Sequence, residues 1–375
     1  MKKKKIAVVG AGLGGMITAM WLEILADELG FEVVLYHDSN VPIERVGQGT
    51  TPDVVNLLHL FLHFEWDDRV MSKDIDYGDG NMIKATKKFG VNYVNWGKKD
   101  VFHPFNPEKT SCHYVPSLLK EEVLKRLNVV DKNIKNPEKE IDSDWIYDCR
   151  GRPGDLEDYH TLTNPINSVI LATGDVDPTM QHTDAIATPD GWTFVIPNQD
   201  SRSYGYLYNN TITTPEIAEK NLSNFFDVKP NGRLSFSNYI AKSIWRGERT
   251  ILNGNMLSFC EPLEAVSGSF YRYVVELTAD YIYRRMGTRS LINDLVQAQM
   301  RRIETFILWH YMGGSKYDTP FWQYAQNLPW KPFAEFDRIL EQIKHTNDMG
   351  NRCRGGDYGS WGNYSFVNWL RTQEV

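Results

Sequence analysis

The sequence predicts an α/β fold, and two neighbouring stretches near the N-terminus carry this prediction. Lys3–Leu25 contains an apolar run, Ile6–Val9, followed by a glycine-rich turn and a run compatible with a helix, Met16–Ala26. Phe31–Tyr36 is rich in β-formers and follows that helix. A strand, a crossover helix and a second strand make a parallel βαβ unit, so we expect a parallel sheet to begin here.

The turn after the first strand has the glycine spacing of a dinucleotide-binding loop. Gly10 permits the tight turn, Gly12 lets the backbone approach a pyrophosphate, and Gly15 lets the helix pack closely on its strand. The N-terminus of the helix also presents free N–H groups to phosphate oxygens. We therefore predict an adenine dinucleotide site at this turn. His37 stands where an acidic residue often holds the ribose, with Asp38 one place later, which weakens any prediction of a ribose contact.

Two other interpretations of the N-terminus were weighed. A glycine turn between strand and helix also occurs without a ligand. A signal peptide would use Met1–Lys5 as its basic region and Ile6–Ala19 as its apolar region. Three glycines interrupt that apolar run and no small-x-small cleavage site follows, so the dinucleotide site is the favoured interpretation.

Composition limits the class of protein. A net charge of −7 argues against nucleic acid and membrane-surface partners, and no apolar run has the length of a membrane span. The four cysteines are scattered without a CxxC pair, which predicts a reduced, cytoplasmic protein with neither a zinc site nor disulfides; they are Cys112, Cys149, Cys260 and Cys353. We expect no metal site.

The rest of the chain alternates between β-rich and helical runs. We expect strands in the second half of Lys84–Trp96 and in the β-rich runs Trp145–Gly151, Val169–Ala172, Gly191–Pro197, Tyr204–Tyr208 and Ile251–Gly254. We expect helices after Val46–Pro52, where Thr51 is a plausible N-cap, and in Val115–Leu127, Glu216–Phe226, Phe270–Met286 and much of the chain from Leu291 on.

Several polar residues have an ordinary interpretation when taken alone. Lys84, Lys87 and Lys88 form a solvated charge run, because lysine is rarely buried unpaired. The Phe102–Phe105 segment, FHPF, is a packing cluster. Glu264 precedes a helix, where the helix dipole favours a carboxylate.

Taken together and in order, nine segments resemble the flavin-dependent tryptophan halogenases, whose fold is similar to that of the flavin aromatic hydroxylases. They are GAGLGG, VGQGTTP, KKFGVNYVNW, FHPF, YDCRG, DAIATPDGWTFVIP, YGYLY, FCEPLEA and DTPFW. The resemblance implies an FAD-binding Rossmann-type three-layer domain with a mixed sheet, as in flavin monooxygenases, plus a smaller, mostly helical module. We expect residues 1–275 to form the core, with an insertion at about 61–140 on the substrate side, and residues 276–375 to form a helical region packed on it.

The resemblance also implies roles for individual residues. Lys88 and Glu264 match the catalytic lysine and glutamate, and His103 and Phe105 match the residues that stack on the aromatic substrate. Ser267 and Gly268 would bind the halide. FAD would be held by Gly10, Gly12, Leu13, Gly14, Gly15, Val46, Gly47, Gly49, Thr50 and Gly254.

The chain departs from the family pattern in four places. Phe194 replaces the second Trp of the GWxWxIP signature, Ala265–Gly268 replaces Ser-Thr-Gly, and His37 stands at the ribose position. The chain is also shorter, with the missing length after Phe105 and near the C-terminus. From the shorter chain we expect an open aromatic site with little enclosure and a broad substrate range, and from the altered loop a preference for bromide or iodide.

The chemistry places demands on two side chains. Reduced flavin and O₂ give a flavin peroxide, which oxidises a halide to hypohalous acid, a small and indiscriminate oxidant. Lys88 would position it, as an ammonium donor or as a halogenated amine, and burial would favour the neutral amine. Glu264 would polarise the oxidant or accept the proton of the arenium intermediate.

Three other expectations follow. No second glycine motif for a nicotinamide is visible, so FADH₂ would come from a separate reductase. The substrate would be a small aromatic molecule, and whether the chain forms a homo-oligomer stays open. Two alternatives also stay open: a flavin-dependent aromatic hydroxylase, and a non-catalytic FAD-binding protein.

Overall fold

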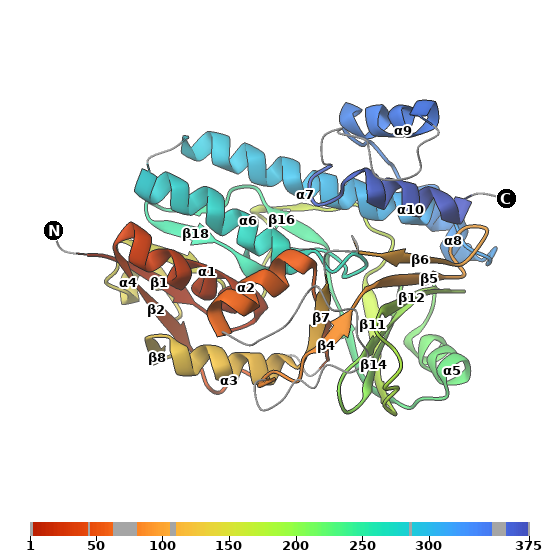
Figure 1. Cartoon of the computed structure of the whole chain (residues 1–375), viewed down its shortest axis with the longest axis horizontal. Helices are drawn as coiled ribbons and strands as arrows, with labels where there is room; N and C mark the ends of the chain where they lie inside the picture. The colour runs from red at the N-terminus through yellow and green to blue at the C-terminus, as the bar shows by residue number, and fades with distance from the viewer. Residues whose placement is uncertain are drawn as a thin grey trace.

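The computed structural model describes residues 3–43, 46–62, 81–105, 110–284, 287–346 and 358–373. Two large sheets lie side by side, and the C-terminal helices run along one side of both (Figure 1). The N-terminal sheet and its helices form the half of the molecule in which the sequence predicts the dinucleotide site. The second sheet and the C-terminal helices form the other half, and Lys88 lies between them.

The first sheet has six strands in the order β17-β18-β9-β1-β2-β8. Its strands are β1 (Lys4–Val9), β2 (Phe31–His37), β8 (Val129–Asp131), β9 (Trp145–Asp148), β17 (Trp245–Arg246) and β18 (Thr250–Leu252). All of its pairings are parallel except that of β17 with β18. The parallel pairing of β1 with both β2 and β9 is the arrangement that the strand–turn–helix pattern predicts.

The central position of β1 in this sheet agrees with its apolar sequence. Ile6 to Val9 of β1 are all buried, because the strand lies between two neighbours and is covered on both faces. Helix α1 (Leu13–Leu29) returns the chain across the sheet and ends at Gly30, whose φ of 71° is the left-handed cap conformation that glycine adopts readily. Helix α1 therefore leads directly into β2.

The second sheet has seven strands in the order β15-β11-β14-β13-β12-β5-β6. Its strands are β5 (Gly90–Val94), β6 (Val101–Pro104), β11 (Ser168–Gly174), β12 (Thr183–Thr188), β13 (Gly191–Pro197), β14 (Arg202–Tyr208) and β15 (Pro230–Ser235). Only β12 and β5 pair in parallel among these described strands. The two aromatic-rich strands expected at 191–197 and 204–208 are the neighbours β13 and β14.

Two smaller sheets connect these layers. One has the order β3-β7-β4, from Gln48–Gly49 (β3), Ser111–Tyr114 (β7) and Thr86–Lys88 (β4). The other has the order β10-β16-β19, from Tyr159–Thr161 (β10), Tyr239–Ala241 (β16) and Ser258–Phe259 (β19). The first of them is important for the site, because it brings the Val46–Pro52 loop beside Lys88.

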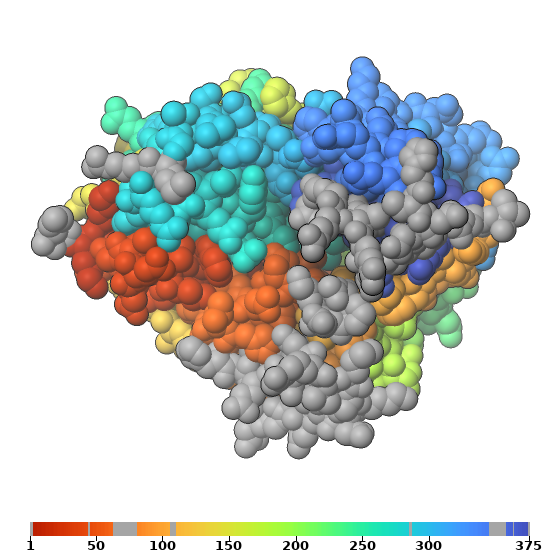
Figure 2. All heavy atoms as spheres, turned by 45° about the horizontal axis from the view of Figure 1, so that its top comes forward, coloured from red at the N-terminus to blue at the C-terminus, as the bar shows by residue number. Residues whose placement is uncertain are grey.

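The helices cover the sheets and build the C-terminal part. The remaining ones are α2 (Pro52–Leu62), α3 (Pro116–Arg126), α4 (Pro137–Glu140), α5 (Pro215–Phe226), α6 (Ser267–Ala279), α7 (Arg289–Met312), α8 (Pro320–Gln326), α9 (Ala334–Thr346) and α10 (Asn363–Gln373), with a 3-10 turn η2 (Gly254–Met256). Helix α6 packs on α1 and α2, and α7 packs on α6. Figure 2 shows α1, α6 and α7 as successive bands on one face, with α9 beside them.

The expected fold class is confirmed: the chain is an α/β protein with mixed sheets and a helical module. One local expectation differs: the helix expected at Phe270–Met286 changes to a π-helical turn, η3 (Asp280–Arg284), after Ala279. The DTPFW segment lies where helical structure is interrupted between α7 and α8. Its Pro320 is the first residue of α8, because proline needs no N–H partner at that position. Cys353 lies outside the described residues.

The expected boundary near residue 275 falls within α6, which packs on the N-terminal half through α1. Within the described ranges no helix combines the length and the apolar character needed to cross a membrane.

Candidate active site

A cavity of about 1050 Å³ opens at the carboxyl ends of β1, β2 and β9. It is lined by the glycine turn after β1, the Val46–Thr50 loop, the segment after β9 and the first residues of α6. Open parallel sheets bind ligands at this edge, and a volume above that of a drug-sized pocket suits a dinucleotide. The cavity ends at Lys88, which is among the residues that line it.

The glycine turn has the shape of a phosphate cradle. A Cβ placed on Gly12 would meet no atom within 4 Å, so this residue faces open space. Gly12 is also the N-cap of α1, and no side chain caps that helix, so its first N–H groups are free for an anion. These observations fit the pyrophosphate of FAD at this turn.

The cofactor residues expected from the sequence divide into two groups. The first group lines the cavity: Gly10, Gly12, Leu13, Gly14, Val46, Gly47, Gly49 and Thr50. The second group, Gly15 and Gly254, packs behind the turn. A Cβ on Gly15 would lie 1.7 Å from the carbonyl oxygen of Gly10, and a Cβ on Gly14 would lie 2.3 Å from Cα of Gly254. Gly254 thus lets two backbones approach and does not line the cavity.

This division predicts that one small substitution lowers stability and another lowers FAD affinity. Gly15→Ala should destabilise the protein by roughly 2–4 kcal/mol, because the new methyl group collides with backbone. Gly12→Ala should leave the melting temperature of the FAD-free protein unchanged but weaken FAD binding by about tenfold or more, through crowding of the cradle. Thermal melts with and without FAD, together with FAD titration, check both. Equal melting temperatures for the two variants would contradict this view of the turn.

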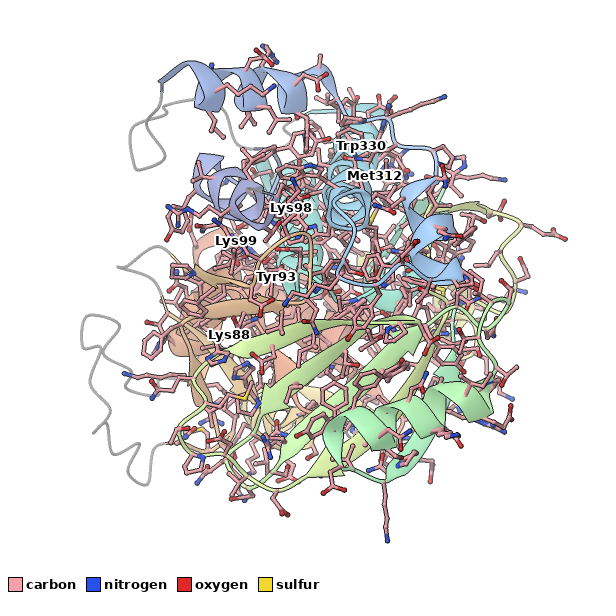
Figure 3. All side chains as sticks on the ribbon, turned by 90° about the vertical axis from the view of Figure 1, so that its right-hand side faces the viewer. Lys88, Tyr93, Lys98, Lys99, Met312 and Trp330 are labelled. Atoms are coloured by element: carbon pink, nitrogen blue, oxygen red, sulfur yellow. The ribbon has the colours of Figure 1, made fainter. Side chains whose placement is uncertain are left out.

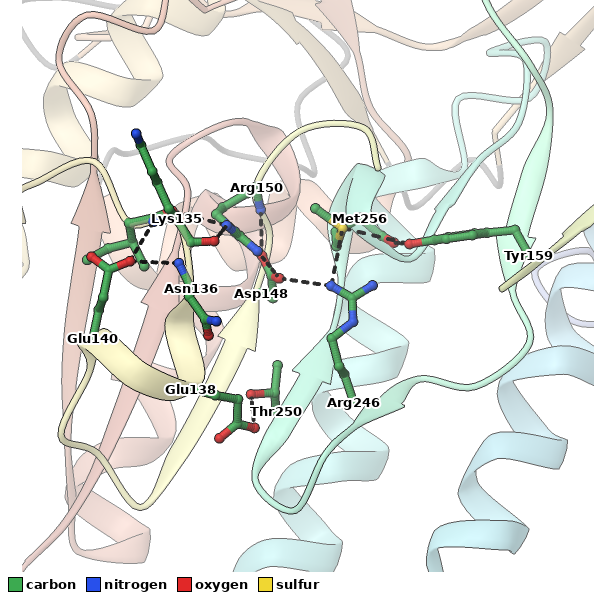
Figure 4. A network of polar contacts seen from close by, with 11 residues as sticks. Lys135, Asn136, Glu138, Glu140, Asp148, Arg150, Tyr159, Arg246, Thr250 and Met256 are labelled. Atoms are coloured by element: carbon green, nitrogen blue, oxygen red, sulfur yellow. Dashed lines mark hydrogen bonds and ion pairs between the residues drawn. The ribbon is translucent and has the colours of Figure 1, made fainter. Parts of the chain in front are cut away.

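A polar network closes the same edge of the sheet after β9 (Figure 4). Asp148 is 1% exposed and accepts two hydrogen bonds from Arg150, each of 2.8 Å. Arg246 lies 3.6 Å from the same carboxylate. Arg150 also donates to the carbonyl oxygen of Lys135 at 2.7 Å and lines the cavity, so its guanidinium is fixed beside the cofactor site.

The ribose end of the cavity differs from the usual pattern, as the sequence suggests. His37 and Asp38 both line the cavity. Both oxygens of Asp38 already accept hydrogen bonds, from the backbone and side chain of Asn40 and from the side chain of Asn133. These bonds lower the pKa of Asp38, with the Asn40 backbone bond contributing most. Its carboxylate therefore stabilises the conformation of the loop after β2.

Lys88 is buried in the core of the molecule. The residue is 2% exposed, and its Nζ donates to the carbonyl oxygen of Thr50 at 3.2 Å and lies 5.5 Å from the ring centre of Phe105. Burial lowers the pKa of Lys88 to about 8, against a smaller opposing effect of Glu264 and Cys112. Figure 3 shows Lys88 and Tyr93 in the interior between the second sheet and the C-terminal helices.

The interpretation of the three lysines as one solvated run is wrong for two of them. Lys87 and Lys88 are both buried, because β4 pairs with β7 on the inside of the molecule. Lys84 does lie at the surface, with a side chain 45% exposed and an ion pair to Asp200. Burial of a charged lysine lowers the folding stability of a protein. The burial of Lys88 therefore suggests a functional role for its amine.

Glu264 lies in a cage of three donors from three parts of the chain. Its Oε1 accepts from the Tyr93 hydroxyl at 2.5 Å and lies 2.8 Å from Nε2 of His310, and its Oε2 accepts from Nε1 of Trp361 at 2.9 Å. Burial by itself would raise the pKa of Glu264, but the contact with His310 and the bonds from Tyr93 and Trp361 outweigh it and hold the pKa at about 2. The carboxylate is therefore ionised, and it lies close enough to Lys88 to favour the charged amine.

His103 lies in β6, and Phe105 comes directly after the end of that strand, but the two residues lie in different surroundings. Helix α10 packs on β6, and His103 contacts Tyr93 and Trp369 with ring centres 4.7 and 6.2 Å away. Burial lowers the pKa of His103 to about 4. Helix α10 thus covers one side of His103, a contact that the sequence did not predict. Phe105 remains the aromatic ring next to Lys88.

The N-terminus of α6 supplies the expected halide residues. Ser267 and Gly268 are its first two residues, and both line the cavity. Val266 is the N-cap and offers no side-chain hydrogen bond. Ala265 has a φ of 53°, a strained value for a residue other than glycine, which turns the chain sharply after Glu264. Helix N–H groups without a side-chain cap thus border the cavity near the candidate catalytic carboxylate.

Sequence reasoning missed the partners of Glu264. Tyr93 lies within the KKFGVNYVNW segment, but nothing in that pattern links its hydroxyl to a residue 171 positions away. His310 and Trp361 stand in helical and Gly/Trp-rich stretches that had no assigned role. Arg150 had a signal, since it belongs to the YDCRG segment at the end of a predicted strand.

The fold and this cavity define an α/β protein with a cavity of dinucleotide size that a buried lysine lines. A family description of tryptophan halogenases matches residues 5–118 and 120–375. The chain belongs to the tryptophan halogenase family.

Known relatives match parts of the sequence and nearly all of the fold. The tryptophan 6-halogenase SttH of Streptomyces toxytricini is 28% identical over 171 residues, which are 44% of this chain and 31% of SttH. The tryptophan 7-halogenase RebH of Lentzea aerocolonigenes is 24% identical over 253 residues, 61% of this chain and 47% of RebH. The matched segments thus span less than half of these relatives.

Two solved structures show the fold. The SttH crystal structure superposes with a TM-score of 0.77 at 19% identity, covering 99% of this chain and 91% of SttH. Xcc4156, a flavin-dependent halogenase from Xanthomonas campestris, gives a TM-score of 0.81 at 14% identity, covering 100% of this chain and 89% of its own.

Proposed function

We propose that this protein is a halogenase that uses FADH₂, O₂ and a halide to halogenate aromatic substrates. One observation carries the proposal: a buried lysine lines a cavity of dinucleotide size, and the charge of Glu264, a buried carboxylate that follows the lining residue Leu263, acts on that lysine. Membership of the tryptophan halogenase family supports it.

FAD fits the cavity, with its pyrophosphate at Gly12 and its ring system beside the Val46–Thr50 loop. Bound and reduced, it would supply the oxidation of halide by O₂ to hypohalous acid. A separate reductase would deliver the reduced flavin. The loop is held in place by backbone pairing of β3 with β7 and by the hydrogen bond of Thr50 to Ser111, of 2.6 Å.

Lys88 would hold the oxidant at the end of the cavity. At neutral pH most of the amine is protonated, and within the described residues one of its N–H groups has an acceptor, the Thr50 carbonyl oxygen. The other N–H groups can donate to hypohalous acid, in surroundings that exclude bulk water. Phe105 beside the amine would stack on the aromatic substrate.

Glu264 would act on the same reaction as a fixed negative charge close to Lys88. It would polarise the oxidant or accept the ring proton, and both roles need the ionised form that its three contacts stabilise. In this proposal the amine and the carboxylate act together on one oxidant.

We further propose that bromide and iodide are preferred to chloride. The N-terminus of α6 offers backbone N–H groups of Ser267 and Gly268 without a charged side chain, next to Val54, which lies 3.0 Å from the position of a Cβ on Gly268. Hydrogen bonds from such a site offset only a small part of the free energy needed to remove water from the halide. That free energy is larger for chloride than for bromide or iodide, because chloride is the smallest of the three. In competition at equal concentrations, brominated or iodinated product should exceed chlorinated product by about tenfold or more. A clear chloride preference would contradict this.

The substrate is proposed to be any of several small aromatic molecules, because the stacking partner next to Lys88 is a single phenyl ring. The test is mass spectrometry of products from a panel of indoles and phenols, with FADH₂, O₂ and each halide in turn. Halogenated products from several substrates are expected. Turnover of free tryptophan alone, at one ring carbon, would contradict the broad range.

The same assay separates the alternatives. Hydroxylated product without halogen, whether or not halide is present, would identify an aromatic hydroxylase. Bound FAD with neither product would identify a non-catalytic flavoprotein.

A further inference from the structure

The partner of Glu264 on α7, His310, has both ring nitrogens committed to oxygen atoms. Its Nδ1 lies 2.9 Å from the carbonyl oxygen of Phe306, one helical turn earlier. A carbonyl oxygen only accepts, so Nδ1 carries a proton. Its Nε2 lies 2.8 Å from Oε1 of Glu264. This is the distance of an ion pair, which forms when the imidazole carries a proton on both nitrogens.

The ring of His310 is fixed as well as paired. The residue is 0% exposed, and the ring of Trp369 lies over it with centres 4.1 Å apart. Phe306 and Tyr93 close two further sides, at 5.3 and 5.4 Å. The imidazole is therefore held where it is by packing, and it cannot turn to water without moving α10.

His310 differs from the other two contacts of the carboxylate in one property. Tyr93 and Trp361 are neutral donors; burial, the charge of Glu264 and the bond to Glu264 all raise the pKa of Tyr93, so it does not ionise. Among the described residues in contact with Glu264, only His310 can carry a positive charge. The pair also has a neighbour on the same loop, Glu261, whose carboxylate accepts hydrogen bonds of 2.7 to 2.9 Å from Tyr311 and Trp192.

More distant titratable groups do not replace His310. His103 on β6 has a pKa of about 4 through burial and is neutral at pH 7, although the charges of Glu264, His310 and Arg371 also act on it. Lys88 on β4 carries charge and acts on Glu264 from a distance. A buried carboxylate left with neutral donors alone would take up a proton more readily.

We propose that His310 is a positioning residue that keeps Glu264 ionised and oriented across the acidic working range of the enzyme. The inference rests on the proposed function, because it assigns a role to a partner of the proposed catalytic carboxylate. It predicts how product formation depends on pH. In wild-type protein the yield should not fall toward acid pH through protonation of Glu264. In a protein without the His310 imidazole the yield should show this fall, called the acid limb below.

The test compares wild-type protein with His310→Leu, which keeps the volume, and His310→Gln, which keeps a neutral donor. Halogenated product per oxidised FADH₂ is measured between pH 5 and 7.5. Wild type should vary by less than about twofold, and His310→Leu should lose about tenfold at pH 5 relative to its own value at pH 7.5, because the ionised fraction of a carboxyl group falls about tenfold for each pH unit below its pKa. His310→Gln should lie between them. Tyr311→Phe, which removes the adjacent buried contact to Glu261, should lower the melting temperature without an acid limb.

A second measurement does not need activity. Infrared spectra should show a protonated carboxyl band in His310→Leu at pH 5.5 that is absent from wild type and is lost again in His310→Leu with Glu264→Gln. If His310→Leu is too unstable, His310→Gln takes its place in both measurements. A uniform loss of product at every pH, with no new carboxyl band, would overturn the inference. Absence of product from wild type together with the band would refute the proposed function and leave the ionisation role standing.

Discussion

Replacing Lys88 by methionine is expected to reduce halogenated product by about 10²- to 10⁴-fold, the range for loss of a positioned acid–base group, while FADH₂ is still oxidised by O₂. Methionine keeps the length and apolar stem of the side chain and removes the amine that faces the end of the cavity. Oxidant would still form but would no longer be held next to the substrate. Product by mass spectrometry, divided by FADH₂ consumed, measures the effect.

The same substitution is expected to stabilise the protein, which a surface lysine would not do. The pKa of Lys88 is about 8 in the fold and 10.5 ordinarily, so burial of the charged amine costs up to about 3 kcal/mol at pH 7. Because the folded pKa is the lower one, this cost is complete below pH 8, declines as the pH rises to about 10.5, and is absent above it. Lys88→Met should therefore melt higher than wild type at pH 7 and gain little at pH 10.5.

Lys84→Met is the matched control, since Lys84 lies four residues earlier with a side chain 45% exposed. It should change neither product nor the pH dependence of stability. If Lys88→Met still formed halogenated product at the wild-type yield, the amine would have no role in the chemistry. If wild type and Lys88→Met both formed hydroxylated product, the protein would be a hydroxylase.

Glu264→Gln is expected to lower product formation by about 10²-fold or more, with the loss in turnover and not in FAD binding. The amide has nearly the same shape but no charge. The NH₂ group of the new amide would also lie opposite a hydrogen-bond donor, because donors contact both carboxylate oxygens: Trp361 contacts Oε2, and Tyr93 and His310 contact Oε1. Steady-state product formation and FAD titration separate the two effects.

The control for Glu264→Gln is Glu261→Gln. Glu261 is also buried and accepts from Trp192, Tyr311 and Asn164. Its replacement should lower the melting temperature through the same donor mismatch, yet the remaining folded protein should keep its yield of product per FADH₂. Equal losses of product in both variants would show that Glu264 acts only through the stability of the loop.

The residue pattern was enough to predict the N-terminal half of the fold, with its parallel sheet and crossover helix. The glycine spacing, the apolar β1 and the β-rich run at Phe31–Tyr36 are local signals, because steric limits on turns and burial of a central strand act within a few residues. The family match at Lys88 and Glu264 also came from the sequence, through the order of short motifs along the chain. In the structure the charge of Glu264 raises the pKa of Lys88 against the effect of burial.

The burial of Lys88 and the hydrogen-bond partners of Glu264 became visible only in the tertiary structure. Burial of Lys88 depends on the pairing of β4 with β7, and the cage around Glu264 needs β5, α7 and the segment before α10 at one point. The enclosure of His103 by α10 joins residues more than 260 positions apart. Contacts of this kind depend on how sheets and helices pack, and no local pattern records them. For this reason a lysine that looks solvated in the sequence is buried at the end of the cavity.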